Sequence, residues 1–188
     1  MVGTTVAYFI AKPGRRKSLS DALFMMPLGV SAVTLGLGFL LALNRPPLDL
    51  RGSWLILVIA HSLVAYPFVI RSLLPVLRGM PRQLKESAAV LGASPFHVFI
   101  HVELPIMTGS LLVGATFAFA VSMGEFGASL LLVRPEFTTI PVAIFRLLAQ
   151  PGEMNLGQAL AMSTLLMAVV VLGFVAIERF RYRGVGGF

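Results

Sequence analysis

Long apolar segments constrain the fold of this chain more than any other feature of its sequence. Three of them, at 26–43, 54–70 and 156–177, contain no Lys, Arg, Asp or Glu. Segments of about 17 to 22 apolar residues have the length that an α-helix needs to cross a bilayer core roughly 30 Å thick. A fourth apolar segment, 105–133, contains one acidic residue, Glu125. We therefore predict an all-α polytopic membrane protein with four or five spans.

The composition leaves little room for a soluble domain and excludes several kinds of chemistry. Hydrophobic residues make up 57% of the 188 positions, charged residues make up 12%, and the mean hydropathy is +0.89. The net charge of +7 comes from Lys and Arg beside apolar segments, without the aromatic-rich basic stripe typical of nucleic-acid binding. Cysteine is absent, which excludes disulfides and thiolate metal sites. No P-loop, G-x-S-x-G or H-E-x-x-H pattern occurs, so we expect no enzymatic activity, metal or cofactor.

The apolar segment 105–133 is too long for one straight helix. Gly124 and Gly127 indicate a break, followed by a bent or re-entrant segment. Glu125 lies between them, and an ionisable side chain at this depth is costly unless it faces a bundle interior or a water-filled cavity. Glu125 is therefore either a gate in the translocation path or a structural carboxylate that accepts hydrogen bonds from backbone groups or Arg146.

The three histidines do not have the spacing of a metal site with carboxylates. His61 lies near the middle of the segment 54–70, where a hydrogen-bonded interior histidine is favoured over a solute ligand. His97 and His101 are four residues apart in a polar stretch, which favours a solvated helix face over a metal site.

The distribution of Lys and Arg predicts the orientation of the spans. Eleven of the 15 Lys and Arg residues lie at 12–17, 71–103 and 178–188, which fall on one side of the alternating spans. Because cytoplasmic segments carry the excess of Lys and Arg, we place 71–103 and the C-terminus in the cytoplasm. The first apolar stretch, Val2 to Ala11, is too short to span, and we interpret it as the cytoplasmic end of a span whose beginning is missing. A short interfacial segment is the alternative.

The polar stretch 71–103 contains a short helix with a well-marked end. Pro81 suits the first turn of this helix. Ser87 and Ala88, which follow Glu86, are small enough to let a second surface approach the backbone closely. Gly92 can adopt the left-handed conformation that ends a helix. Taken alone, such a helix would favour a position on the lipid headgroups.

A second short helix and the start of a span follow. Ser94 can cap this helix and Pro95 can open it. Leu104 and Pro105 lie at its far end, where we expect the next span to begin at Pro105. The two helices together would form a rigid element on one face of the membrane, joined to a span through a few residues.

The spacing of these residues resembles the EAA loop of binding-protein-dependent ABC importer permeases, the MetI-like family. The family pattern is E-A-A, three residues, G, nine residues, I, one residue and L-P. It is matched here by Glu86, Ser87, Ala88, Gly92, Val102, Leu104 and Pro105, with Ser87 in place of Ala and Val102 in place of Ile. The resemblance covers a transmembrane domain at 1–183, which includes the EAA-type loop 78–105, and leaves a tail at 184–188.

The resemblance implies an all-α bundle that forms half of a translocation pore in the bacterial inner membrane. Its loop would dock on a cytoplasmic ATPase dimer, with Glu86 pairing with a basic group there or, alternatively, with Arg82 on its own helix. The other implied partners are a second permease subunit or fused half, an external solute-binding protein and membrane lipid. ATP hydrolysis on the ATPase would drive alternating access.

A second resemblance concerns the transported solute. Gly124-Glu125-Phe126-Gly127 and the segment 139–146 resemble the branch that imports ferric iron, thiamine or phosphonates, which implies iron(III) as a solute. The alternative function is a secondary transporter or channel driven by an ion gradient, with Glu125 as the proton or cation site.

Overall fold

The computed structural model describes residues 2–11, 23–44, 49–50 and 52–185. All of the named elements in these ranges are helices, and one isolated bridge joins Arg134 and Phe137. In chain order they are α1 (Val2–Ala11), the 3₁₀ helix η1 (Met26–Gly29), α3 (Ala32–Ala42), α4 (Leu55–Gly79), α5 (Arg82–Val90), α6 (Pro95–Val98), the π-helix η2 (Phe99–Glu103), α7 (Leu104–Gly124), α8 (Gly127–Leu132), α9 (Ile140–Leu148) and α10 (Glu153–Val185). The predicted all-α fold is confirmed.

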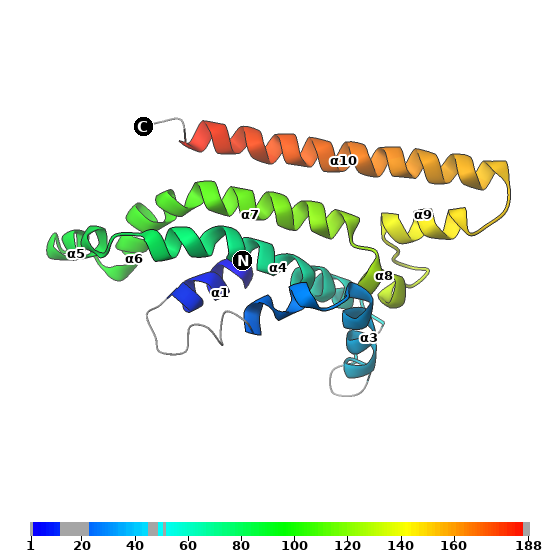
Figure 1. Ribbon diagram of the computed structural model, residues 1–188, viewed down its shortest axis with the longest axis horizontal. Helices are drawn as coiled ribbons and strands as arrows, with labels where there is room; N and C mark the ends of the chain where they lie inside the picture. The colour runs from blue at the N-terminus through cyan, green and yellow to red at the C-terminus, as the bar shows by residue number, and fades with distance from the viewer. Residues whose placement is uncertain (1, 12–22, 45–48, 51, 186–188) are drawn as a thin grey trace.

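Three long helices lie side by side and form the body of the molecule. In Figure 1, α4, α7 and α10 follow the long axis, with α7 between the other two. The helix α1 packs against α4, and α9 packs against α10 at the end opposite α5 and α6. A buried apolar cluster joins α1, α4 and α7 and includes Ala7, Ile70, Leu73, Leu77 and Met107. The α4 members recur at spacings of three and four, so they lie on one buried helix face.

Three helices in the described part of the chain are long and apolar enough to cross a membrane. They are α4, the continuous helix Pro95–Gly124 and the segment Glu153–Phe180 of α10. A fourth span results if the bent pair Leu23–Gly29 and Ala32–Ala42 counts as one. The described residues thus contain three spans, or up to four, where four or five were predicted.

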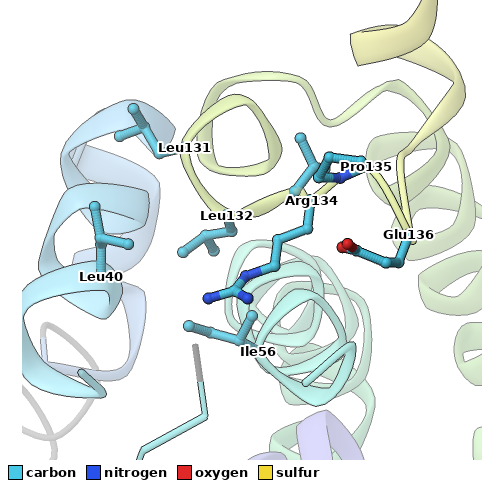
Figure 2. Close-up of a pocket in the computed structure, with 8 residues that line it drawn as sticks. Leu40, Ile56, Leu131, Leu132, Arg134, Pro135 and Glu136 are labelled. Carbon is cyan, nitrogen blue, oxygen red and sulfur yellow. The ribbon is translucent and has the colours of Figure 1, made fainter. Parts of the chain in front are cut away.

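The predicted span at 26–43 is not one continuous helix. Val30 and Ser31 have extended backbone, with ψ of 138° and 135°, so η1 ends there and the two flanking helices meet at 113°. The helix α3 packs instead against α8, where a Cβ on Gly36 would lie 2.8 Å from the Cα of Ala128. A pocket opens beside this contact, between α3, α4 and the residues that follow α8 (Figure 2).

The helix of the second predicted span does not end with that span at Ile70, because α4 continues to Gly79. Leu73, Leu74 and Leu77 are buried and extend the apolar face of α4 into the segment that carries Arg71 and Arg78. Burial of that face stabilises the helix beyond the first arginine, and Arg71 and Arg78 stay exposed beside it.

A prediction about the second half of the chain is confirmed. The long apolar segment breaks where expected, because α7 ends at Gly124 and α8 begins at Gly127. The short helix α9 follows before α10.

Candidate functional site

The helix α5 presents an unusually exposed end. Its α-helical residues run from Arg82 to Val90, and Glu86 and Ser87 are exposed while Ala88 is half-buried. Val90 and Leu91 are 88% and 87% exposed, although they are large and apolar. A shallow hollow of about 470 Å³ lies along this face, lined by Gln83, Glu86, Ser87, Val90 and Leu91. Apolar surface of this kind typically marks an interaction site.

Glu86 projects from this face without an ion pair in the described part of the chain. The pair with Arg82 that the four-residue spacing allowed is not formed. The Glu86 side chain is therefore available to a partner.

Gly92 ends α5 with a left-handed residue, as its position in the motif predicted. Its φ is +84°, in the region that favours glycine. The amide of Gly92 donates to the carbonyl of Ala89 at 2.9 Å, and the amide of Ala93 donates to the carbonyl of Ala88 at 3.0 Å. These two bonds are the Schellman arrangement, which satisfies the last carbonyls of a helix. The chain therefore turns sharply and in a defined direction after α5.

The helix after this turn runs into the membrane without a gap. Ser94 caps α6, because its hydroxyl oxygen accepts from the amide of His97 at 3.4 Å, and Pro95 occupies the first turn. The helix of this span does not begin at Pro105, because α6, η2 and α7 form one continuous helix from Pro95 to Gly124. The π-turn of η2 immediately precedes Leu104 and Pro105. Wide turns of this type are frequent at functional sites.

An ion pair that sequence reasoning missed joins α5 to this continuous helix. Lys85 pairs with Glu103, whose side chain is 3% exposed, while the Lys85 side chain is 40% exposed. Among the described residues, the second carboxylate oxygen of Glu103 has no hydrogen-bond partner. The two residues are far apart in sequence, so no helical spacing signalled the pair; the acidic residue directly before Leu104-Pro105 was the one visible hint.

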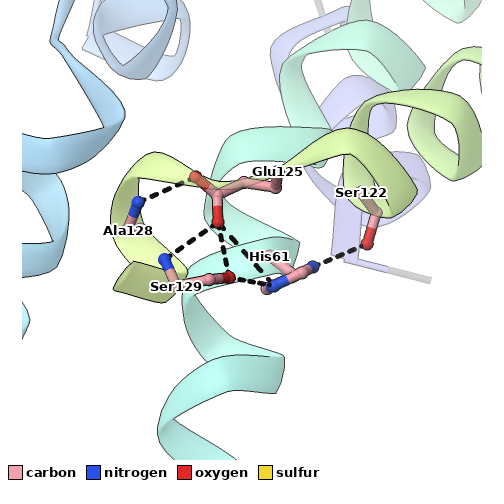
Figure 3. A network of polar contacts seen from close by, with 5 residues as sticks. All are labelled: His61, Ser122, Glu125, Ala128 and Ser129. Atoms are coloured by element: carbon pink, nitrogen blue, oxygen red, sulfur yellow. Dashed lines mark hydrogen bonds and ion pairs between the residues drawn. The ribbon is translucent and has the colours of Figure 1, made fainter. Parts of the chain in front are cut away.

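The break after α7 is held by Glu125 (Figure 3). Its carboxylate accepts from the amides of Ala128 at 2.8 Å and Ser129 at 3.0 Å, and from the Ser129 hydroxyl at 2.7 Å. These amides are unpaired donors of the first turn of α8, so Glu125 acts as a helix cap. The side chain is buried, and its contacts match the structural alternative stated above, with backbone donors and without Arg146.

His61 connects α4 to the same break, as an interior hydrogen-bonded histidine. Its Nε2 lies 2.9 Å from the Ser129 hydroxyl and its Nδ1 lies 2.9 Å from the Ser122 hydroxyl. The Ser129 hydroxyl donates its one hydrogen to Glu125, so it must accept from Nε2–H of His61. Figure 3 shows this chain of contacts running from α7 through α4 to α8.

The site residues predicted from the sequence lie at the two ends of the long helix Pro95–Gly124. Glu86, Ser87, Ala88, Gly92, Leu104 and Pro105 belong to the EAA-type loop 78–105, and Gly124, Glu125 and Gly127 belong to the break at the other end of α7. His97 and His101 stack with ring centroids 5.6 Å apart. The described residues contain no group of three His, Cys, Asp or Glu side chains that could hold a metal ion.

Comparison with known protein families adds the decisive observation. Residues 2–183 match the model of the family described as binding-protein-dependent transport system inner membrane component. The chain belongs to this family. The resemblance drawn from the EAA-type motif is thereby confirmed, and the chain is a multi-pass inner-membrane protein of the permease type.

Curated relatives carry names of several transport systems. PhnV of Salmonella typhimurium, named for a 2-aminoethylphosphonate transport system, is 31% identical over 85% of this chain and 59% of its own length. The molybdenum transport system permease ModB of Escherichia coli is 29% identical over 83% of this chain and 74% of its own length. A protein of Nephroselmis olivacea named as a sulfate transport system permease, cysT, is 32% identical over 79% and 57%. The chain thus spans about 59% of the length of PhnV.

Proposed function

We propose that this chain is the transmembrane permease subunit of an ATP-driven importer and that α5 is the helix by which it docks on a cytoplasmic ATPase. The observation that carries this proposal is the exposed apolar end of α5, fixed to a spanning helix by one turn and one ion pair. Covering Val90 and Leu91 in a cleft would contribute about 1.5–3 kcal/mol each. A helix held in this way can pass a displacement to the membrane helices as a rigid body.

The proposed cycle is alternating access. Closure of an ATPase dimer would move α5, α7 would move with it, and the pore formed with a second permease subunit or fused half would open outward to a solute-binding protein. We place α5 and the C-terminus in the cytoplasm on the basis of the Lys and Arg count. The residues Glu86, Ser87, Ala88 and Gly92 would form the docking surface, and Leu104 and Pro105 the joint with α7.

We propose a small oxyanion as the solute. The relatives named above belong to 2-aminoethylphosphonate, molybdenum and sulfate systems, and none of them is named for iron. These names give no support to the iron(III) solute expected from Gly124-Glu125-Phe126-Gly127. The chemistry that the relatives' solutes share is an anion with several oxygen atoms.

The ion-gradient alternative has no supporting observation. It would require Glu125 to exchange a proton or cation during transport, yet three donors already occupy the carboxylate. We propose instead that Glu125 keeps the break between Gly124 and Gly127 in shape beside the translocation path.

The test uses the absence of native cysteine. A single cysteine at Ala88 should crosslink to a P-loop ATPase co-expressed with the permease, and a membrane-impermeant maleimide should reach it only from the cytoplasmic side. A matched cysteine at Gln150, which is exposed in the loop after α9, should be labelled from outside and should not crosslink to the ATPase. Labelling of Ala88→Cys from outside would refute the proposed orientation, and absence of any crosslink to the ATPase would refute the docking.

Transport itself is tested by Gly92→Glu. This variant should reach the membrane in normal amounts but lose ATP-dependent uptake of sulfate, molybdate or 2-aminoethylphosphonate, whichever the wild type accumulates. Normal uptake by the variant would contradict the docking model.

A further inference from the structure

A charged pocket lies at the end of the molecule opposite α5. It has a volume of about 320 Å³ and is lined by Leu40, Ile56, Leu132, Arg134, Pro135 and Glu136 among others. Figure 2 shows the Arg134 guanidinium directed toward Leu40 and Ile56, and the Glu136 carboxylate pointing toward the Arg134 side chain. Two opposite charges therefore share one pocket with apolar walls.

The backbone holds Arg134 in this position. The amide of Arg134 donates to the carbonyl of Phe137 and the amide of Phe137 donates to the carbonyl of Arg134, both at 3.2 Å. This tight turn directly follows α8, whose last residue, Leu132, is buried. The backbone of Arg134 is thus tied to the buried part of the fold rather than to a free loop.

Arg134 and Glu136 do not neutralise each other. In the part of the chain that the structure describes, neither side chain forms an ion pair, with the other or with any third residue. A guanidinium against apolar walls has lost part of its hydration, so an anion that supplies oxygen acceptors would be bound with charge-assisted hydrogen bonds. A carboxylate on the same pocket favours a cationic group on that ligand.

We propose that this pocket binds an aminoethyl-phospho group, with the phosphonate or phosphate oxygens on Arg134 and the ammonium group on Glu136. Two sources carry this group: free 2-aminoethylphosphonate, and the headgroup of phosphatidylethanolamine. The free solute is the source that follows from the proposed function, on which this inference rests. The Lys and Arg count puts Arg134 on the outer side, where a binding protein would release its solute.

The experiment measures equilibrium binding of radiolabelled 2-aminoethylphosphonate to the purified transporter complex in nanodiscs made only of phosphatidylglycerol. Arg134→Gln should weaken binding by about tenfold or more, the loss expected for a charge-assisted contact. Glu136→Gln should weaken binding of 2-aminoethylphosphonate but not of ethylphosphonate, which lacks the ammonium group. The matched controls Arg146→Gln and Glu153→Gln remove exposed charges that do not line the pocket, and they should bind like the wild type.

A second arm separates the two sources. If the wild type binds no free 2-aminoethylphosphonate but retains phosphatidylethanolamine through purification, and Arg134→Gln and Glu136→Gln lose that lipid, the pocket is a headgroup site. If both variants match the wild type toward the free solute and toward the lipid, or if the wild type binds neither, the pocket assignment is wrong. A wrong pocket assignment leaves the proposed function intact if Ala88→Cys, with no other substitution, still crosslinks to the ATPase. If Ala88→Cys alone does not crosslink, the proposed function fails separately from the pocket.

Discussion

Replacing Lys85 with methionine tests whether charge holds α5 against the base of α7. The substitution keeps an unbranched side chain, one atom shorter, and removes its charge, which leaves the carboxylate of Glu103 buried at 3% exposure without its observed cation. Breaking a fully buried ion pair costs about 3–5 kcal/mol, and breaking an exposed pair costs about 0–1 kcal/mol. Lys85 is 40% exposed, so we expect an intermediate loss of about 1–3 kcal/mol.

The reverse substitution should be milder. Glu103→Gln removes the negative charge that faces Lys85, but the Lys85 side chain is 40% exposed and stays in contact with water. The amide oxygen can also still accept a hydrogen bond from the ammonium group. We therefore expect Glu103→Gln to cost less than Lys85→Met, and the double variant to cost less than the two losses added together.

The assay is hydrogen exchange of the α5 amides in nanodiscs. A local loss of about 1–3 kcal/mol should speed exchange of residues 83–91 roughly 5- to 150-fold, because each 1.4 kcal/mol is a factor of ten. Arg82→Met is the matched control, since it removes an exposed cation from the same helix that forms no ion pair in the described structure. Equal acceleration by Lys85→Met and Arg82→Met, or strict additivity in the double variant, would refute the reasoning.

Three further substitutions test the turn, the helix contact and the break. Gly92→Ala should destabilise the turn after α5 by about 1–2 kcal/mol, because φ is +84° there, and should reduce uptake. The control Gly79→Ala also has open space around the added Cβ and should not reduce uptake. Equal uptake by the two variants would contradict this. Gly36→Leu should lower the melting temperature by several degrees, because a Cβ at this position meets the Ala128 backbone at 2.8 Å. Gly38→Leu should be tolerated, because nothing lies within 4 Å of a Cβ there. An unchanged melting temperature of Gly36→Leu would show that α3 does not pack on α8 as described. Glu125→Gln presents an NH₂ group to donors that now face a carboxylate, so unfolding should become easier by about 1–3 kcal/mol; wild-type stability in a thermal unfolding assay would argue against the capping role.

The features predicted correctly from the sequence are those that local chemistry decides. Gly124 and Gly127 mark the break because an apolar segment with an acidic residue between two glycines cannot continue as a straight span. Gly92 marks the end of α5 because the left-handed conformation needs no partner from elsewhere in the fold.

The boundaries that were predicted wrongly depend on packing between distant segments. The continuation of α4 to Gly79 is decided by burial of Leu73 and Leu77 against α1 and α7, which no window of the sequence around Arg71 reveals. Pro105 was expected to begin a helix because proline suits the first turn. The helix instead begins at Pro95, and the π-turn before Leu104 accommodates Pro105 in its interior. The bend at Val30 and Ser31 likewise follows from the contact of α3 with α8.

The carboxylates of Glu103 and Glu125 together give α7 a mechanical role that neither the EAA-type loop nor the break at Gly124 suggests by itself. Glu103 lies one residue before α7 and ties it to α5 through Lys85, and Glu125 lies one residue after α7 and ties it to α8. Both side chains are buried, so releasing either end would leave a carboxylate uncompensated at a cost of a few kcal/mol. In the proposed transport cycle, a displacement of α5 would therefore be passed along α7 to the break rather than absorbed at its ends. The helix contacted by the ATPase and the segment beside the pore would move as one body, and His61 would carry that movement to α4 through its bond to Ser129.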